Sequence, residues 1–228
     1  MNQLENKKFV ILGLPRTGTC ALRHSLIDSG LSVCPGEPFF AEEFKNFTSI
    51  HRHNHLKYSG EIFKDYDGFK IIVGHSEQVL DICAQNNAKL ILTRRHNFLS
   101  FMASYYVLVT GQHKRTGKNT GSNSESYSTW TSTGNEVIYK PLPFMNYVVD
   151  RFLYYNYLID NVYNKHENYL TTIDFEDVTK GVSDLENHFD IPINLNITSN
   201  TLLSKYFINH EEFRLDVENR MKIILGNE

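Results

Sequence analysis

The chain has 228 residues, 41% of them hydrophobic and 13% aromatic, which is enough for one α/β domain with a full core. The formal net charge of -3 excludes a broadly basic surface, so nucleic acid is not an expected partner. The cysteines are too few and too widely spaced for a disulfide framework and predict a reducing compartment; they are Cys20, Cys34 and Cys83.

Neither metal nor membrane binding is expected. No group of cysteines and histidines has the spacing of a structural zinc site. The alternating histidines at 51–55, HRHNH, are more typical of an exposed polar loop than of a metal site. The polar N-terminus, MNQLENKKF, shows no signal peptide and the chain no transmembrane segment, so we expect a soluble, cytoplasmic protein.

The first structured element is an apolar run of β-forming residues at 9–12, FVIL, which predicts a buried strand. A glycine-rich turn follows at 13–20, GLPRTGTC, and the apolar pattern at 21–30 predicts a helix. A strand, a glycine loop and a helix favour an anion site, because the loop N–H groups and the helix dipole point at one spot. The loop residues that we expect to contact the anion are Pro15, Arg16, Thr17, Gly18, Thr19 and Cys20.

The turn departs from the loop that binds nucleoside triphosphates, in which Lys and then Ser or Thr directly follow the second glycine. Here Thr19 and Cys20 follow Gly18, so the lysine is lost and a thiol replaces the metal-binding hydroxyl. The positive charge lies within the loop instead, at Arg16, whose guanidinium suits phosphate-like oxygens. This pattern indicates a phosphate-bearing donor bound without Mg²⁺; the alternative is an ordinary strand-to-helix turn.

The segment at 13–19, GLPRTGT, resembles the 5′-phosphosulfate loop of the sulfotransferases that use 3′-phosphoadenosine 5′-phosphosulfate (PAPS). The resemblance implies PAPS as co-substrate and transfer of its sulfuryl group to a hydroxyl or an amine. It also implies a catalytic role for Arg16, which with the loop N–H groups would stabilise charge on the leaving oxygen. We expect a small-molecule acceptor, and a carbohydrate first.

A short strand is predicted at 31–34, and Glu37 follows it in the segment PGEPFF. Desolvation by Phe39 and Phe40 raises the proton affinity of a carboxylate, which suits a general base. Many sulfotransferases that act on sugars have a Glu before aromatic residues at this point, so the resemblance makes Glu37 the candidate catalytic base. The alternative is a turn carboxylate that pairs with a nearby basic residue.

A third strand is predicted at 69–73, and His75 lies beyond it, at the edge where α/β sheets bind ligands. His75 is the second candidate catalytic residue, because it can orient Glu37, contact the sulfuryl group or act as base itself. A capping role before a helix at 76–86 is the alternative. Lys70 lies inside the strand and reaches either a cleft or merely an edge.

A fourth strand at 89–93 ends at Arg94 and Arg95, and a helical pattern follows. An Arg at a strand end and a Ser on the next helix can bind one phosphate, which resembles the 3′-phosphate motif of the family. The family spacing is eight residues, whereas Ser104 lies nine residues after Arg95 and ten after Arg94. We expect Arg95 and Ser104 to bind the 3′-phosphate, with Arg94 as the alternative arginine.

Residues 111–134 are dense in Gly, Ser, Thr and Asn and too poor in apolar residues to bury a core. A loop of this length is usually functional or disordered, so we expect a mobile lid or acceptor-binding loop. Trp130, the only tryptophan, lies in it and can stack on a sugar or an adenine. The alternative is an insertion without function.

The rest of the chain predicts a long core helix at 143–165, a fifth strand at 169–173, a helix at 178–189 and two helical stretches in the tail. The alternation predicts a single α/β domain over 1–228, with a parallel sheet of about five strands and helices on both faces. With the resemblance, this is a P-loop-type fold and a PAPS-dependent sulfotransferase. The alternatives are a P-loop kinase of small molecules or nucleotides, and a non-catalytic protein that binds the desulfated product PAP (3′-phosphoadenosine 5′-phosphate).

Overall fold

The computed structural model describes residues 7–39, 55–74, 78–110, 113–116, 129–132, 138–195, 203 and 207–226. The chain divides into two compact units. The sheet unit comprises Met1–Arg95 and Tyr155–Thr198, and the helical unit comprises His96–Tyr154 and Ser199–Glu228. The single domain expected over the whole chain stays a prediction.

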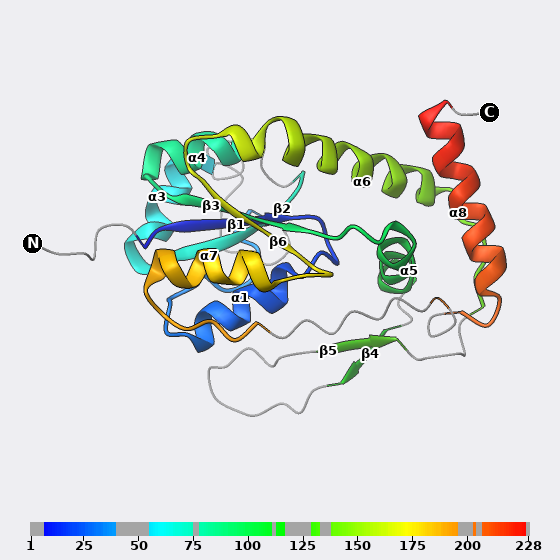
Figure 1. The fold of residues 1–228 in the computed structure, drawn as a ribbon, viewed down its shortest axis with the longest axis horizontal. Coiled ribbons are helices and arrows are strands. Elements are labelled where there is room, and N and C mark those ends of the chain that lie inside the picture. Colours follow the sequence, from blue (N-terminus) through cyan, green and yellow to red (C-terminus); the bar gives the residue numbers. More distant parts are fainter. Residues whose placement is uncertain are drawn as a thin grey trace, which may run out of the picture. The chain divides into compact units, whose positions relative to one another are not determined.

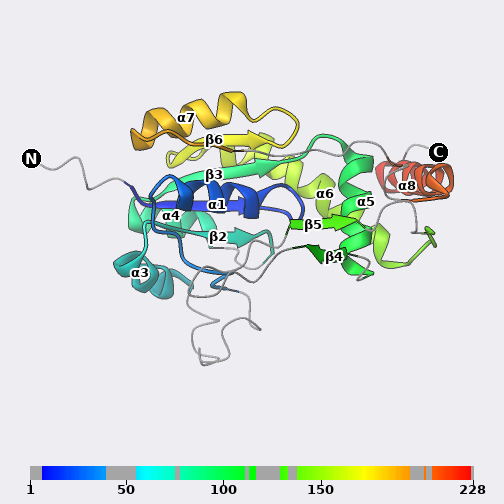
Figure 2. The same ribbon diagram turned by 90° about the horizontal axis from the view of Figure 1, so that it is seen from below.

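The sheet unit is built on a parallel sheet whose strands have the order β2-β1-β3-β6 (Figures 1 and 2). The strands are β1 (Phe9–Gly13), β2 (Gly68–Ile72), β3 (Lys89–Arg94) and β6 (Tyr169–Asp174). Every residue of β1 and β2 is buried, although β2 lies at an edge of the described sheet and carries Lys70. The predicted α/β class with a parallel sheet is therefore confirmed.

The predicted count of about five strands is wrong for the described residues, where the parallel sheet has four. The strand expected at 31–34 is reduced to one isolated bridge between Val33 and Gly68. Pairing stops there because Pro35 has no N–H to donate and Gly36 turns the chain at a φ of 66°.

Helices cover both faces of this sheet (Figure 1). One face carries α1 (Thr19–Asp28) and α7 (Thr179–Phe189). The other carries α4 (Val79–Asn86) and the end of α6 (Phe144–Asn161), while α3 (His55–Asp65) packs against β2 and a 3₁₀ turn, η2, spans Tyr163–Lys165. The apolar core between α1, α7 and the sheet includes Phe9, Ile11, Leu22, Leu26, Ile91, Ile173, Leu185 and Phe189. This packing fixes the turn between β1 and α1 at the carboxyl edge of the sheet.

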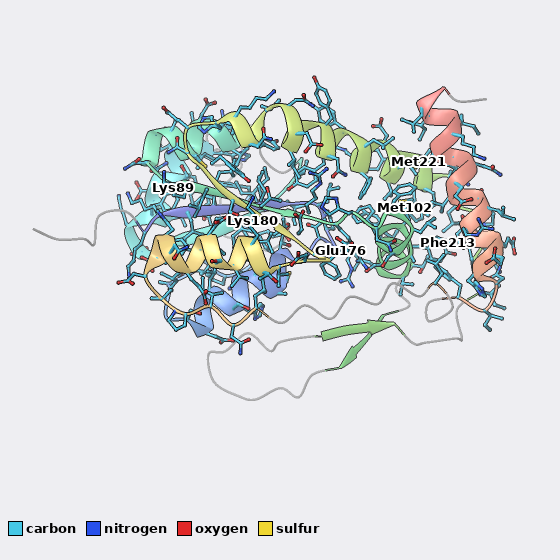
Figure 3. All side chains as sticks on the ribbon, viewed as in Figure 1. Lys89, Met102, Glu176, Lys180, Phe213 and Met221 are labelled. Carbon is cyan, nitrogen blue, oxygen red and sulfur yellow. The ribbon has the colours of Figure 1, made fainter. Side chains whose placement is uncertain are left out.

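The helical unit contains α5 (Phe98–Val109), the first part of α6, and α8 (His210–Leu225). Its core includes Met102 of α5 and Phe213 of α8, both fully buried and labelled in Figure 3. Of the two helical stretches predicted for the tail, α8 lies in the described part of the chain. No helix there combines the length and the apolar character that crossing a bilayer requires.

The expectation of a loop throughout 111–134 is wrong at two places, where the backbone forms strands. These are β4 (His113–Thr116) and β5 (Thr129–Ser132), an antiparallel pair in which His113 lies opposite Ser132. Thr and Trp favour extended backbone, which fits the segment TWTS of β5. The other residues of 111–134 lie outside the described part of the chain.

Candidate anion site at the first strand–helix turn

The turn between β1 and α1 is held in shape by hydrogen bonds of its own residues. The N–H and the hydroxyl of Thr17 both donate to the carbonyl oxygen of Leu14, at 3.3 and 2.7 Å. The Thr17 hydroxyl also lies 2.7 Å from that of Thr93, at the end of β3. A Cβ on Gly13 would overlap the Thr93 hydroxyl and lie 2.6 Å from a methyl carbon of Thr19. Gly13 is therefore needed for close packing.

Two residues of the turn have left-handed backbone conformation, Arg16 at a φ of 73° and Gly18 at 91°. For Arg16 this conformation costs about 1 kcal/mol, so the surrounding bonds must hold it there. Gly18 is the N-cap of α1 and has no side chain, and the first turn of α1 carries no acidic residue. The N–H groups at the start of α1 thus keep their positive potential, as an anion site requires.

A lysine from the neighbouring strand reaches the start of α1. The Lys70 Nζ lies 3.2 Å from the Cys20 Sγ and 3.0 Å from a carboxylate oxygen of Glu37. The Lys70 side chain is 8% exposed, and that of Glu37 is 18% exposed. We call these three residues the Lys70 cluster.

The electrostatics of the Lys70 cluster favour a charged lysine. Burial lowers the pKa of Lys70, but attraction to Cys20 and to the Glu37 carboxylate more than offsets it, so the pKa is raised above its usual value. Lys70 therefore supplies an ammonium group next to the position where the triphosphate loop has its own lysine. The lysine in the run FKII was the available signal, but the sequence does not show where its side chain ends.

Glu37 lies after the Pro35–Gly36 turn, and Phe39 anchors that segment. The Phe39 ring packs 5.6 Å from the ring of Phe69 and 5.8 Å from that of Tyr58. The expected partial desolvation of Glu37 is present, and so is the alternative expected for it, a pairing with a basic residue. A cation 3.0 Å away favours the ionised carboxylate, and the role of Glu37 as base stays a prediction.

The two arginines at the end of β3 have different surroundings. Arg94 donates two hydrogen bonds to the Asp160 carboxylate, at 2.8 and 3.2 Å. Arg95 is buried, donates from Nη1 to the Arg16 carbonyl oxygen at 3.3 Å, and lies 4.3 Å over the ring of Phe175. Arg95 is thus the arginine that the structure places at the turn.

The other predicted site residues have mixed outcomes. Ser104 is buried on α5 in the helical unit, so its pairing with Arg95 stays a prediction. Pro15 is half-buried in the turn, Cys20 is exposed, and Thr19 is buried. His75 and Phe40 lie outside the described residues, as does the side chain of Trp130.

A tyrosine that the sequence did not single out braces the sheet edge under the turn. Tyr155 of α6 is fully buried, and its hydroxyl lies 2.9 Å from the Leu12 carbonyl oxygen and 3.0 Å from that of Thr93. One hydroxyl proton is shared between the ends of β1 and β3. Burial raises the pKa of Tyr155 well above its usual value, so the hydroxyl stays protonated and can donate.

Within the described part of the chain, no three His, Cys, Asp or Glu side chains gather where they could hold a metal ion. No protein-family model matches the chain, and no curated protein matches it either. The arrangement can therefore be judged by its own chemistry: an uncapped helix start with three cationic side chains at the turn.

Proposed function

We propose that the chain is a sulfotransferase of P-loop-type fold, which binds PAPS at the turn between β1 and α1. It would transfer the sulfuryl group to an acceptor hydroxyl or amine, with a carbohydrate as the first acceptor to test. PAPS carries phosphate and sulfate groups that a helix start and fixed cations can bind without Mg²⁺.

One observation carries this proposal: an uncapped helix start is preceded by an arginine in its own turn and approached by a lysine paired with Glu37 and by a buried arginine. Arg16 is part of the turn, Lys70 enters from β2 next to Cys20, and Arg95 bonds the turn backbone from β3. Positive groups fixed in advance around a leaving oxygen stabilise the charge that develops on it during transfer. The same cations fit a phosphate donor, so the 3′-phosphate is the distinguishing test.

Arg95 is the residue assigned to the 3′-phosphate in this proposal, together with Ser104. Its guanidinium lies against the Phe175 ring and bonds the Arg16 carbonyl, which restricts its rotation. A guanidinium fixed in this way loses little conformational freedom when it binds an anion. Arg94 is held by Asp160 and serves as the matched control.

The test is thermal unfolding with PAP, AMP and ATP, each with and without Mg²⁺. A ligand at ~100 times its dissociation constant adds about 2.7 kcal/mol to the free energy of unfolding. PAP should stabilise the protein without Mg²⁺, and AMP should do so much less. Equal stabilisation by PAP and AMP would overturn the 3′-phosphate assignment, and stabilisation by ATP only with Mg²⁺ would favour a kinase.

A pair of variants locates the 3′-phosphate site. Arg95→Lys should remove most of the preference for PAP over AMP, because a point charge replaces the planar guanidinium. Arg94→Lys should keep that preference. The opposite result would assign the 3′-phosphate to Arg94.

The candidate base is tested in turnover after an acceptor screen with labelled donor. Glu37→Gln should lower turnover by ~10²–10⁴-fold, the usual contribution of a positioned acid or base. If Glu37→Gln keeps turnover and His75→Ala loses it, His75 is the base. A screen in which no acceptor is sulfated, although PAP binds, would favour the non-catalytic alternative.

A further inference from the structure

The Lys70 cluster places an accessible thiol within hydrogen-bonding distance of a buried amine. Cys20 lies on α1 and is exposed, whereas Lys70 lies on β2 and is more than nine-tenths buried. Their Sγ and Nζ atoms are 3.2 Å apart although the residues are 50 positions apart in the chain. The other two thiols, Cys34 and Cys83, are buried.

We propose that hydrogen peroxide joins Cys20 to Lys70 through a covalent sulfur–nitrogen bond, a reversible cross-link between α1 and β2. The cross-link makes the anion site sensitive to oxidants. Its formation is independent of the proposed function; only its effect on PAP binding rests on that function.

The first chemical step oxidises the sulfur. The Cys20 Sγ attacks one oxygen of hydrogen peroxide, the O–O bond breaks, and the thiol proton leaves with the other oxygen as water. The sulfur loses two electrons to the peroxide and becomes a sulfenic acid, Cys–SOH. Solvent and peroxide reach this sulfur because Cys20 is exposed.

The second step condenses the sulfenic acid with the lysine. Glu37, 3.0 Å from Nζ, accepts one proton of the ammonium group, and the nitrogen lone pair attacks Sγ. The S–O bond breaks, and the hydroxyl leaves as water with a second nitrogen proton. The product is Cys–S–NH–Lys, with one proton passed through Glu37 to solvent. Sulfenic acids condense with an adjacent backbone nitrogen in this way, and the adjacent nitrogen here is the Lys70 Nζ.

The surroundings of Lys70 favour this condensation once the sulfur is oxidised. Attraction to Cys20 is the largest of the causes that raise the pKa of Lys70, and a sulfenic acid is uncharged. Its formation weakens the stabilisation of the ammonium, which burial already disfavours. The Glu37 carboxylate, 3.0 Å from Nζ, accepts the proton, and the amine so formed lies next to an electrophilic sulfur.

The cross-link changes the anion site in two ways. The Lys70 nitrogen loses its positive charge, and the Cys20 side chain is drawn from solvent toward β2. Both changes occur at the start of α1, where the proposed donor binds. Thiol reductants cleave the sulfur–nitrogen bond and restore both side chains.

Mass spectrometry tests the cross-link directly in the full-length protein. Peroxide-treated protein is alkylated and digested with trypsin, which cleaves after Arg16, Arg23, Lys64 and Lys89. The expected product is peptide 17–23 joined to peptide 65–89, uncleaved at Lys70 and lighter by two hydrogen atoms than the sum of the two. Dithiothreitol should separate the two peptides.

Two variants serve as controls. Cys20→Ser should give no cross-link, and Lys70→Arg, which keeps the charge, should stop at a sulfenic acid that dimedone traps. If Lys70→Arg does not fold, dimedone competition in the wild-type protein replaces it and should suppress the cross-link. Oxidation of Cys20 to sulfinic acid or an intermolecular disulfide, without the joined peptides, would overturn the proposal.

The effect on ligand binding is measured separately. Cross-linked protein should lose its stabilisation by PAP, and dithiothreitol should restore it. If the joined peptides form but PAP stabilises neither the reduced nor the oxidised protein, the cross-link holds and the proposed function fails. If PAP stabilises the reduced protein and the joined peptides never form, the proposed function stands and the cross-link fails.

Discussion

Replacement of Glu37 by Gln should destabilise the protein, in addition to any effect on catalysis. The change keeps the size of the side chain and leaves the Lys70 ammonium buried without its carboxylate. An uncompensated buried charge is among the most destabilising consequences of a single substitution. The Cys20 thiol, 3.2 Å from Nζ, remains as a weak partner.

The magnitude follows from the geometry of the pair. Two unit charges 3.0 Å apart attract each other by about 5.5 kcal/mol at an effective dielectric constant of about 20. Breaking a buried pair on one side costs about 3–5 kcal/mol after desolvation. Because 18% of the Glu37 side chain is exposed, we expect the lower end, about 3 kcal/mol.

Urea unfolding of a double-mutant cycle measures this interaction near neutral pH. Lys70→Met should lower the free energy of unfolding by about 2 kcal/mol, and the double variant with Glu37→Gln should lower it by only about 3 kcal/mol. The two single losses together exceed the loss of the double variant by about 2 kcal/mol, which is the coupling energy of the pair. The reasoning would be refuted if the losses of the two single variants add in full in the double variant. It would also be refuted if Glu37→Gln lowers the free energy of unfolding by less than about 0.5 kcal/mol.

The same variant predicts a change in the dependence of stability on pH. Because the folded pKa of Lys70 is raised, its contribution is complete below the ordinary value of 10.5 and is lost as pH rises through the folded pKa. Glu37→Gln removes one cause of that elevation, so the variant should lose less stability than the wild type above about pH 10. Tyrosines with raised pKa, such as Tyr58 at about 12, contribute equally to both proteins. Parallel curves would contradict the prediction.

Three further substitutions have matched controls, and urea unfolding measures each of them. Gly13→Ala should lower the free energy of unfolding by about 3 kcal/mol because its Cβ overlaps Thr93. Gly60→Ala, in the middle of α3, places its Cβ in ordinary contact with the Asn86 side-chain oxygen at 3.9 Å and should raise the free energy of unfolding by about 0.5–1 kcal/mol; equal effects would contradict the close packing. Tyr155→Phe should cost about 2 kcal/mol by leaving two buried carbonyl oxygens without their donor, and the exposed Tyr157→Phe less than about 0.5 kcal/mol. Glycine adopts the left-handed backbone of position 16 without the strain that alanine has there, so Arg16→Gly should be more stable than Arg16→Ala by about 1 kcal/mol. Both variants should lose PAP binding. Equal stability of the two variants would show that the backbone at Arg16 is not strained.

The sheet could be predicted from sequence because two of its strands, β1 and β3, are short apolar runs that are buried along most of their length. The apolar runs of β1 and β3 have no competing interpretation, since neither carries a helical period or a breaker. The segment at 31–34 is apolar as well, but its pairing depends on the two residues directly after it. Pro35 and Gly36 end the pairing after one residue, and turn geometry of this kind is hard to weigh from composition alone.

The candidate site could be predicted only where its residues are contiguous. The turn between β1 and α1 was found because glycine, arginine and threonine occur together in one short segment. Lys70 and Tyr155 were not assigned to it, because their partners lie on elements distant in the chain. A lysine in a buried strand and a tyrosine on a core helix are compatible with many environments, and only the packing of the sheet decides among them.

The hydrogen bonds that Thr17 makes to Leu14 and Thr93 have a consequence for the rate at which the proposed donor would bind. A segment that already has its bound shape need not rearrange after encounter, so association should not be limited by loop closure. The positive charges of Arg16 and Arg95 then attract an anionic ligand over a distance set by the ionic strength, whereas the charge of Lys70 is compensated by Glu37. The association rate constant should therefore decrease steeply with added salt, while the dissociation rate constant changes little.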